Sequence, residues 1–74
     1  MIYYLIYNGE NYYSHNRNPF SNRFDPEFTR NVVNAKYFKD RTSAKEVLDK
    51  IKKIGITGYA VRSMDDIRRN PWKR

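Results

Sequence analysis

The 74-residue sequence contains no cysteine. Disulfide bonds, thiolate metal sites and thiol chemistry are therefore excluded, and the absence is typical of a reducing cytoplasm. His15 is the single histidine, so histidines cannot cluster around a metal. The glycines Gly9, Gly55 and Gly58 do not have the spacing of a phosphate-binding loop. We expect no metal and no cofactor.

Long apolar runs are also missing. Residues 1–7 are apolar, but they have no basic start and end at Asn8-Gly9, far below the roughly 20 residues of a membrane span. A chain of this length has room for one small core of marginal stability. We predict a cytoplasmic domain over residues 1–66 that does not contact a membrane, followed by a basic tail over residues 67–74.

Positive charge is in excess, and all of the excess lies in the second half. The formal net charge is +7. Residues 1–34 carry three arginines and three carboxylates, whereas residues 35–74 carry twelve Lys and Arg against five Asp and Glu. A field of this kind attracts polyanions and acidic surfaces.

The first fifteen residues predict a β-hairpin. Residues 2–7 are β-branched, aromatic or Leu, Asn8-Gly9 suits a two-residue turn, and residues 10–15 resume a strand-like composition. Alternation divides the side chains between two faces, Tyr3, Leu5, Tyr7, Tyr12 and Ser14 on one and Ile2, Tyr4, Ile6, Tyr13 and His15 on the other. Both faces are apolar enough to require cover.

Residues 16–34 combine turn formers with three regularly spaced aromatics. Phe20, Phe24 and Phe28 recur at four-residue intervals, which predicts that the segment folds over the sheet. Asp25 as N-cap and Pro26 at the first helical position predict a short helical turn over Pro26–Asn31.

The most regular pattern predicts a helix from Ser43 to Ile54. Ser43 and Glu46 have the spacing of a capping box, and Gly55 lies where a left-handed C-terminal residue is needed. The apolar stripe of this helix consists of Ala44, Val47, Leu48, Ile51 and Ile54.

The composition of Thr57–Met64 predicts a third strand. A second cap pattern over residues 63–66 predicts a short helix over Asp65–Asn70, which Pro71 ends. The fold class is therefore α+β, a single β-β-α-β domain in which an N-terminal hairpin and a third strand pack on one amphipathic helix.

The order of these elements resembles a group of proteins. A Tyr-rich hairpin, the piece Asn34–Lys39 and a Lys-rich helix opened by Thr42–Leu48 precede a final strand, as in small accessory proteins of bacteriophages and prophages. The resemblance covers most of Asn34–Met64 and rests on generic residues. It implies a protein that acts in a host cell by binding a host or defence component, and it transfers no functional residue.

The groups that could support catalysis have simpler interpretations. The pairs Asp65-Asp66 and Asp25-Glu27 lie where helix N-termini use carboxylates as caps. Ser14 and His15 are adjacent in a strand and should point to opposite faces. We therefore expect no enzyme, and a small hydrolase or nuclease is a remote third hypothesis.

The lysines and tyrosines are open to two interpretations each. The helix lysines could contact phosphates, but Glu46 and Asp49 lie four residues from Lys45, Lys50 and Lys53, which favours a solvated, partly neutralised face. The tyrosines could stack on bases, but the hairpin carries no Lys or Arg before residue 17, which favours a core or a protein interface.

The candidate binding residues are the remaining cations and the single Trp. They are Lys36, Lys39, Arg41, Arg62, Arg68, Arg69, Trp72, Lys73 and Arg74. We predict a non-enzymatic phage-type protein that inhibits or modulates a host protein or nucleoprotein complex, with these residues on an acidic patch and exposed hairpin tyrosines adding apolar contact. The alternative is a direct, sequence-nonspecific nucleic-acid-binding protein.

Overall fold

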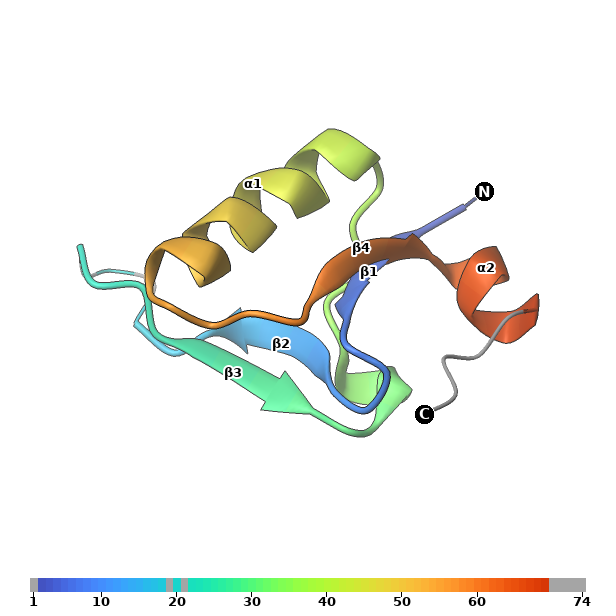
Figure 1. Cartoon of the computed structure of the whole chain (residues 1–74), viewed down its shortest axis with the longest axis horizontal. Coiled ribbons are helices and arrows are strands. Elements are labelled where there is room, and N and C mark those ends of the chain that lie inside the picture. The colour runs from blue at the N-terminus through green and yellow to red at the C-terminus, as the bar shows by residue number, and fades with distance from the viewer. Residues whose placement is uncertain (1, 19, 21, 70–74) are drawn as a thin grey trace.

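In the computed structural model, which describes residues 2–18, 20 and 22–69, one long helix lies against a four-stranded antiparallel sheet (Figure 1). The strand order is β3-β2-β1-β4. The elements are β1 (Tyr4–Tyr7), β2 (Tyr12–Asn16), β3 (Pro26–Thr29), the 3₁₀ turn η1 (Val32–Asn34), α1 (Arg41–Lys53), β4 (Ala60–Ser63) and α2 (Met64–Arg69). The predicted α+β class is confirmed, with one strand more than the sequence indicated.

The N-terminal hairpin forms, but its connection is longer than predicted. Tyr7 pairs with Tyr12, so four residues link the strands instead of two. Asn8 closes this loop, because its Oδ1 accepts the backbone N–H groups of Glu10 at 2.8 Å and Asn11 at 2.6 Å. Two extra residues preserve the strand alternation, so the predicted division of side chains between the two faces holds as far as Tyr13, where the pairing of β2 becomes irregular.

The helical turn predicted over Pro26–Asn31 is wrong, and these residues begin with strand β3 at the edge of the sheet. A proline is tolerated at the first residue of an edge strand, where its missing N–H costs little. Phe28 pairs opposite Tyr13, with ring centroids 6.2 Å apart. Asp25 caps no helix and instead forms an ion pair with Arg17 at 3.0 Å. Aromatic packing has overridden the local helix signal, and the segment extends the sheet instead of covering it.

Helix α1 begins at Arg41, two residues before the predicted start. Its N-cap is Asp40, whose Oδ1 accepts the backbone N–H of Ser43 at 2.8 Å. That hydrogen bond lowers the pKa of the Asp40 carboxyl below its usual value. The capping box predicted at Ser43 is therefore wrong, because Asp40 already satisfies the donor group of this first turn.

The C-terminus of α1 is as predicted. Gly55 has a φ of 92°, in the left-handed region that favours glycine. The backbone N–H groups of Gly55 and Ile56 donate to the carbonyls of Lys52 at 3.0 Å and Ile51 at 3.3 Å, which is the Schellman arrangement.

The apolar stripe of α1 packs on one face of the sheet. Ile54, the last position of the predicted stripe, is 48% exposed and lies outside this core. The buried cluster consists of Ile6, Tyr13, Phe38, Ala44, Leu48 and Ile51. It joins β1, β2, the segment before α1 and the helix into one core.

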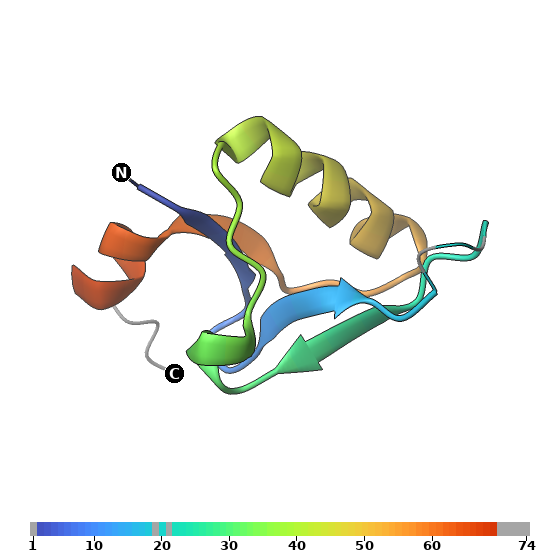
Figure 2. The same cartoon turned by 180° about the vertical axis from the view of Figure 1, so that it is seen from behind.

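Residues 35–38 pass between β1 and β2, where these two strands separate. Tyr4 and Phe38 exchange two backbone hydrogen bonds of 2.9 Å, and the N–H of Lys36 donates to the carbonyl of Tyr13 at 2.9 Å. Figure 2 shows the segment rising from η1 toward α1. The chain thereby crosses the sheet while its backbone groups remain paired.

The C-terminal elements differ from the prediction in their bounds. Strand β4 is shorter than Thr57–Met64, since Gly58 adopts a φ of 91° just before it. The predicted cap is confirmed, because the N–H of Asp66 donates to Ser63 Oγ at 3.0 Å. The boundary drawn at residue 67 between domain and tail falls inside α2. Within residues 2–18, 20 and 22–69, neither helix has the length and apolar character needed to cross a membrane.

Candidate polyanion-binding surface

Of the nine binding residues predicted from the sequence, the structure describes six. Trp72, Lys73 and Arg74 lie outside the described residues. Arg68 and Arg69 are exposed on α2, which lies at one end of the long axis of the molecule (Figure 1). Both side chains are therefore accessible, and they lie far along that axis from the C-terminal half of α1.

Arg62 does not have the surface position that the prediction gave it. Its side chain is only 11% exposed, and its Nε donates to Asp66 Oδ2 at 2.7 Å. A guanidinium held in this way joins β4 to α2. We therefore assign Arg62 to the structure of the domain and not to its binding surface.

The three cations around the start of α1 are exposed and lie beside aromatic rings. Arg41 is the first residue of α1, and its guanidinium carbon lies 5.0 Å from the centroid of the Tyr4 ring. Lys36 Nζ lies 5.9 Å from the centroid of the Phe38 ring. Lys39 is exposed in the segment that precedes the helix. Cation–π contacts of this length order the side chains weakly and leave their charge accessible.

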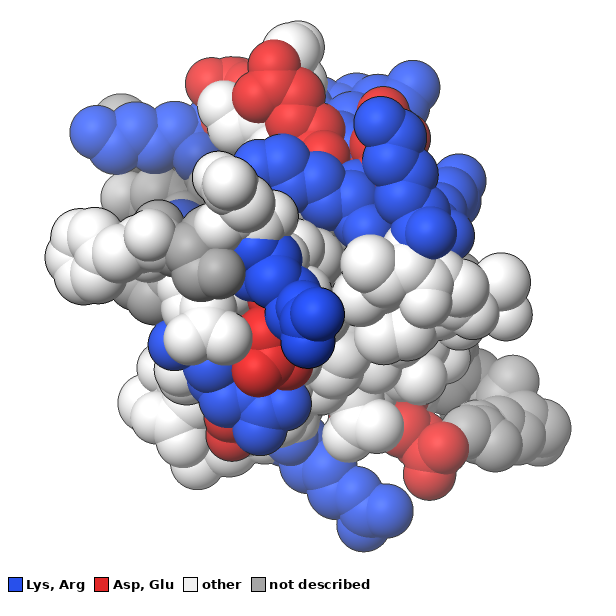
Figure 3. Space-filling view, turned by 90° about the vertical axis from the view of Figure 1, so that its left-hand side faces the viewer, with Lys and Arg blue, Asp and Glu red and all other residues white. Residues whose placement is uncertain are grey.

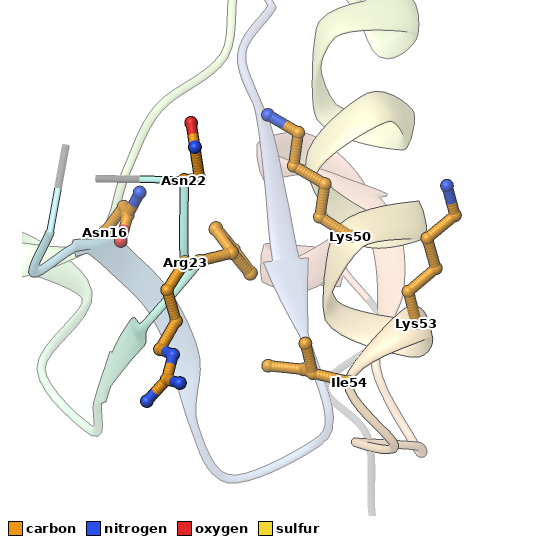
Figure 4. Close-up of a pocket in the computed structure, with 7 residues that line it drawn as sticks. Asn16, Asn22, Arg23, Lys50, Lys53 and Ile54 are labelled. Carbon is orange, nitrogen blue, oxygen red and sulfur yellow. The ribbon is translucent and has the colours of Figure 1, made fainter. Parts of the chain in front are cut away.

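A cleft of about 650 Å³, which we call the α1 cleft, lies beside the C-terminal half of α1 (Figure 4). Lys50 and Lys53 come from the helix, and Asn22 and Arg23 come from the loop that faces it. The lining residues are Asn16, Asn22, Arg23, Phe24, Lys50, Lys53 and Ile54. Three cations and no carboxylate therefore line this recess.

Figure 3 shows this end of the molecule in a space-filling view. Lysine and arginine side chains spread over α1 and over the centre of the face, with carboxylates interspersed. The carboxylates of Asp25 and Glu27 are engaged by Arg17 at 3.0 Å and 3.5 Å. Because these acids already have a cationic partner, they reduce the positive field of the cleft only in part.

The apolar part of the α1 cleft is supported by the core. Phe24 is half-buried, and its ring is roughly parallel to that of Tyr13, with centroids 6.3 Å apart and an angle of 28°. Ile54, which the sequence assigned to the buried stripe, contributes its exposed side chain to the lining. The cleft thus combines cations with an aromatic side chain that the core holds in place.

A smaller groove of about 230 Å³ lies on the other flank of α1, beside strand β4. It also has no carboxylate, and it is lined by Arg41, Lys45, Leu48, Lys52, Tyr59, Ala60 and Val61. Partial burial raises the pKa of the Tyr59 hydroxyl. The helix therefore presents two lysines to each of two recesses.

The structure shows the lysines of α1 as exposed, in agreement with the predicted solvated face. Among the residues that it describes, no ion pair joins a lysine of α1 to Glu46 or Asp49. The sequence analysis missed the α1 cleft because it treated the helix lysines as a solvated face and Phe24 as sheet cover. A detectable signal was present, since Lys53 and Ile54 lie three and four residues after Lys50 and therefore share one flank of the helix with it.

Of the hairpin tyrosines, Tyr13 belongs to the buried cluster and Tyr4 packs against it, whereas Tyr3, Tyr7 and Tyr12 contact other aromatic rings outside that cluster. Tyr7 and Tyr12 stack with ring centroids 4.4 Å apart, and Tyr3 meets Tyr37 edge to face at 5.8 Å. All five hairpin tyrosines are within the described residues and are buried or half-buried, namely Tyr3, Tyr4, Tyr7, Tyr12 and Tyr13. The expected exposed apolar contact surface is therefore not formed by them.

Ser14 and His15 are in contact, contrary to the argument from strand alternation. The pairing of β2 with β3 is irregular between Tyr13 and His15, and Ser14 Oγ lies 3.0 Å from His15 Nδ1. The Ser14 hydroxyl donates to the carbonyl of Asn34 at 3.0 Å. An imidazole activates a serine only by accepting its proton, and here that proton is directed to a carbonyl. The hydrogen bond from Ser14 to Asn34 thus joins β2 to η1.

The described residues contain no group of three or more side chains suited to hold a metal ion. Comparisons with family models, curated proteins and solved structures find no match to this chain. The resemblance to phage accessory proteins therefore stays a prediction. The chemistry of the clefts is the remaining guide to function.

Proposed function

We propose that the protein is a non-enzymatic nucleic-acid-binding protein that contacts phosphates through the lysines of α1. The observation that carries the proposal is the pair of recesses on the two flanks of this helix, each lined by three cations and no carboxylate. Nonspecific nucleic-acid binding depends on such cations, because neutralised phosphates release their counterions.

Several features support a polyanion over an acidic protein surface. The protein carries a net charge of +7, and the tyrosines of its hairpin are buried or half-buried. Protein interfaces of high affinity are centred on buried aromatic or arginine anchors surrounded by apolar contacts. The two recesses are instead each lined by three cations, and cationic side chains are the groups that contact phosphates.

Binding of a generic oligonucleotide over a range of salt concentrations tests the proposal. Four phosphate contacts predict a log–log slope of about 3 to 4 units on a duplex. The test variant replaces all four lysines of α1 by Gln, namely Lys45, Lys50, Lys52 and Lys53. The charge-matched control replaces Lys36, Lys39, Arg68 and Arg69 by Gln.

The two variants have the same net charge, so a difference between them reports the location of the contacts. We expect the helix variant to lose most of the salt slope and the control variant to keep more than half of it. No binding by the unchanged protein at low salt would contradict the proposal. A larger loss of salt slope in the control variant would instead place the phosphate contacts on the cations that the sequence analysis predicted.

Inhibition or modulation of a host protein or nucleoprotein complex is the second candidate function. The observation that favours it is the exposure of Arg68 and Arg69 on α2, away from the α1 cleft. This candidate function requires that the protein bind free oligonucleotide weakly and a defined acidic protein tightly. The tight binding should be lost when both arginines are replaced by Gln. Action in the cytoplasm of a host cell belongs to this candidate.

A further inference from the structure

We propose that the α1 cleft takes single-stranded nucleic acid, with a base against Phe24 and successive phosphates on Arg23, Lys50 and Lys53. This inference rests on the proposed function and specifies the substrate class and the site. The cleft volume of about 650 Å³ is within the range of roughly 300–1,000 Å³ typical of small-ligand sites. One nucleotide unit of a strand is a ligand of that class.

The cations of the cleft are arranged for a chain of phosphates. Figure 4 shows Lys50 and Arg23 on opposite sides of the cleft, with side chains that extend in different directions. Cations that bind one phosphate or a free nucleotide would converge on a single point. Side chains that diverge can instead contact neighbouring phosphates of one strand, which explains why we favour a polynucleotide.

The aromatic lining decides between single and double strands. Phe24 is half-buried and lines the cleft, and its ring packs beside that of Tyr13, with 6.3 Å between ring centroids. A base reaches a ring in such a position only when it is unstacked from its own neighbours. Bases in a duplex stay stacked on their neighbours, whereas the bases of a single strand stack readily on protein aromatics that lie between cations.

The wall that faces the helix is organised by hydrogen bonds of its own. Asn16 Oδ1 accepts the N–H groups of Asn18 and Asp25, both at 3.0 Å, so this side chain shapes the loop. Asn22 is exposed at the rim of the cleft. Its amide offers both donors and an acceptor, which suits contact with a base edge without selecting one base.

Fluorescence anisotropy with a labelled oligo-dT and with a duplex of mixed sequence tests the inference on the full chain. The first variant is Phe24→Leu, which keeps apolar bulk against Tyr13 but removes the aromatic face. We expect single-strand affinity to fall about 5- to 150-fold, the range that follows from loss of one base–aromatic stack. The salt slope should stay unchanged, because no cation is removed.

The second variant combines Lys50→Gln with Lys53→Gln, and its matched control combines Lys36→Gln with Lys39→Gln, two exposed lysines that line neither recess. We expect the first pair to reduce the single-strand slope by about 1.4 units and the control to change it by less than half as much. These four side chains are exposed, so both variants should fold, and a melting curve for each variant verifies this.

The outcomes separate this inference from the proposed function. Equal losses in the two lysine pairs, equal affinity for duplex and single strand, or unchanged affinity in a folded Phe24→Leu protein would each overturn the α1 cleft as a single-strand site and leave nucleic-acid binding in place. No binding of either oligonucleotide by the unchanged protein would overturn both. Preference for the single strand together with loss in Phe24→Leu supports the site.

Discussion

Truncation of Leu48 to Ala is the most direct test of the core. Leu48 is 7% exposed and belongs to the buried cluster that joins α1 to the sheet. The substitution removes three carbon atoms, which at about 0.8 kcal/mol per buried methylene corresponds to roughly 2.4 kcal/mol of transfer free energy. A cavity term raises the total for such substitutions to about 2–5 kcal/mol.

The position of Leu48 indicates the lower half of that range. Its side chain also contributes to the groove beside β4, so neighbouring groups and water can partly fill the space. We expect a loss of about 2–3.5 kcal/mol in the free energy of unfolding. A domain of 74 residues has roughly 4–11 kcal/mol in total. The melting temperature should therefore fall by roughly 10–25 °C.

Thermal and urea unfolding followed by circular dichroism measure the loss. The matched control is Ile54→Ala on the same helix, where the side chain is 48% exposed, and it should cost less than about 1 kcal/mol. An unchanged melting temperature in Leu48→Ala, or equal losses in the two variants, would refute the assignment of the core.

Two further substitutions test local contacts that only the structure shows. Asp40→Asn should lower the melting temperature at neutral pH more than Ser43→Ala does, because the second variant keeps the Ser43 backbone N–H that donates to Asp40 Oδ1 at 2.8 Å. The pKa of the Asp40 carboxyl is lower in the folded state than the unfolded value of 3.8. The contribution of this carboxylate to stability is therefore present above pH 3.8 and is lost as the pH falls through the folded pKa. Melting temperatures of the unchanged protein and of Asp40→Asn should thus converge as the pH is lowered. Asp66→Asn should cost about 1–2 kcal/mol because it weakens the pair with the mostly buried Arg62, and Asp65→Asn, at an exposed position, should cost less than about 0.5 kcal/mol by urea unfolding. Equal effects at the two aspartates would contradict the structural role of this ion pair.

The elements that the sequence predicted correctly are those governed by short-range periodicity and local backbone chemistry. The stripe of α1 is visible as apolar residues that recur every three to four positions. The left-handed conformation at Gly55 is accessible because glycine has no Cβ. The cap at Ser63 needs only a hydroxyl three residues before the N–H that it accepts. Each of these depends on groups within one helical turn of each other.

The elements that the sequence could not give depend on distant partners. Strand β3 exists because Phe24 and Phe28 pack beside Tyr13, although the local residues favour a helix start. Arg62 is buried because β4 and α2 meet around it. The irregularity in β2, with the Ser14–His15 contact beside it, accompanies the separation of the strands where residues 35–38 pass.

The sequence by itself therefore determined the fold class, the buried positions Ala44, Leu48 and Ile51 of the helix, the hairpin faces as far as Tyr13 and the excess of positive charge. Only the tertiary structure decided where that charge could act. Lys50 and Lys53 acquire an aromatic neighbour, Phe24, that is 26 residues or more away along the chain. Contacts of that separation are selected by packing of the whole core, because local propensity carries no information about which distant surfaces will meet.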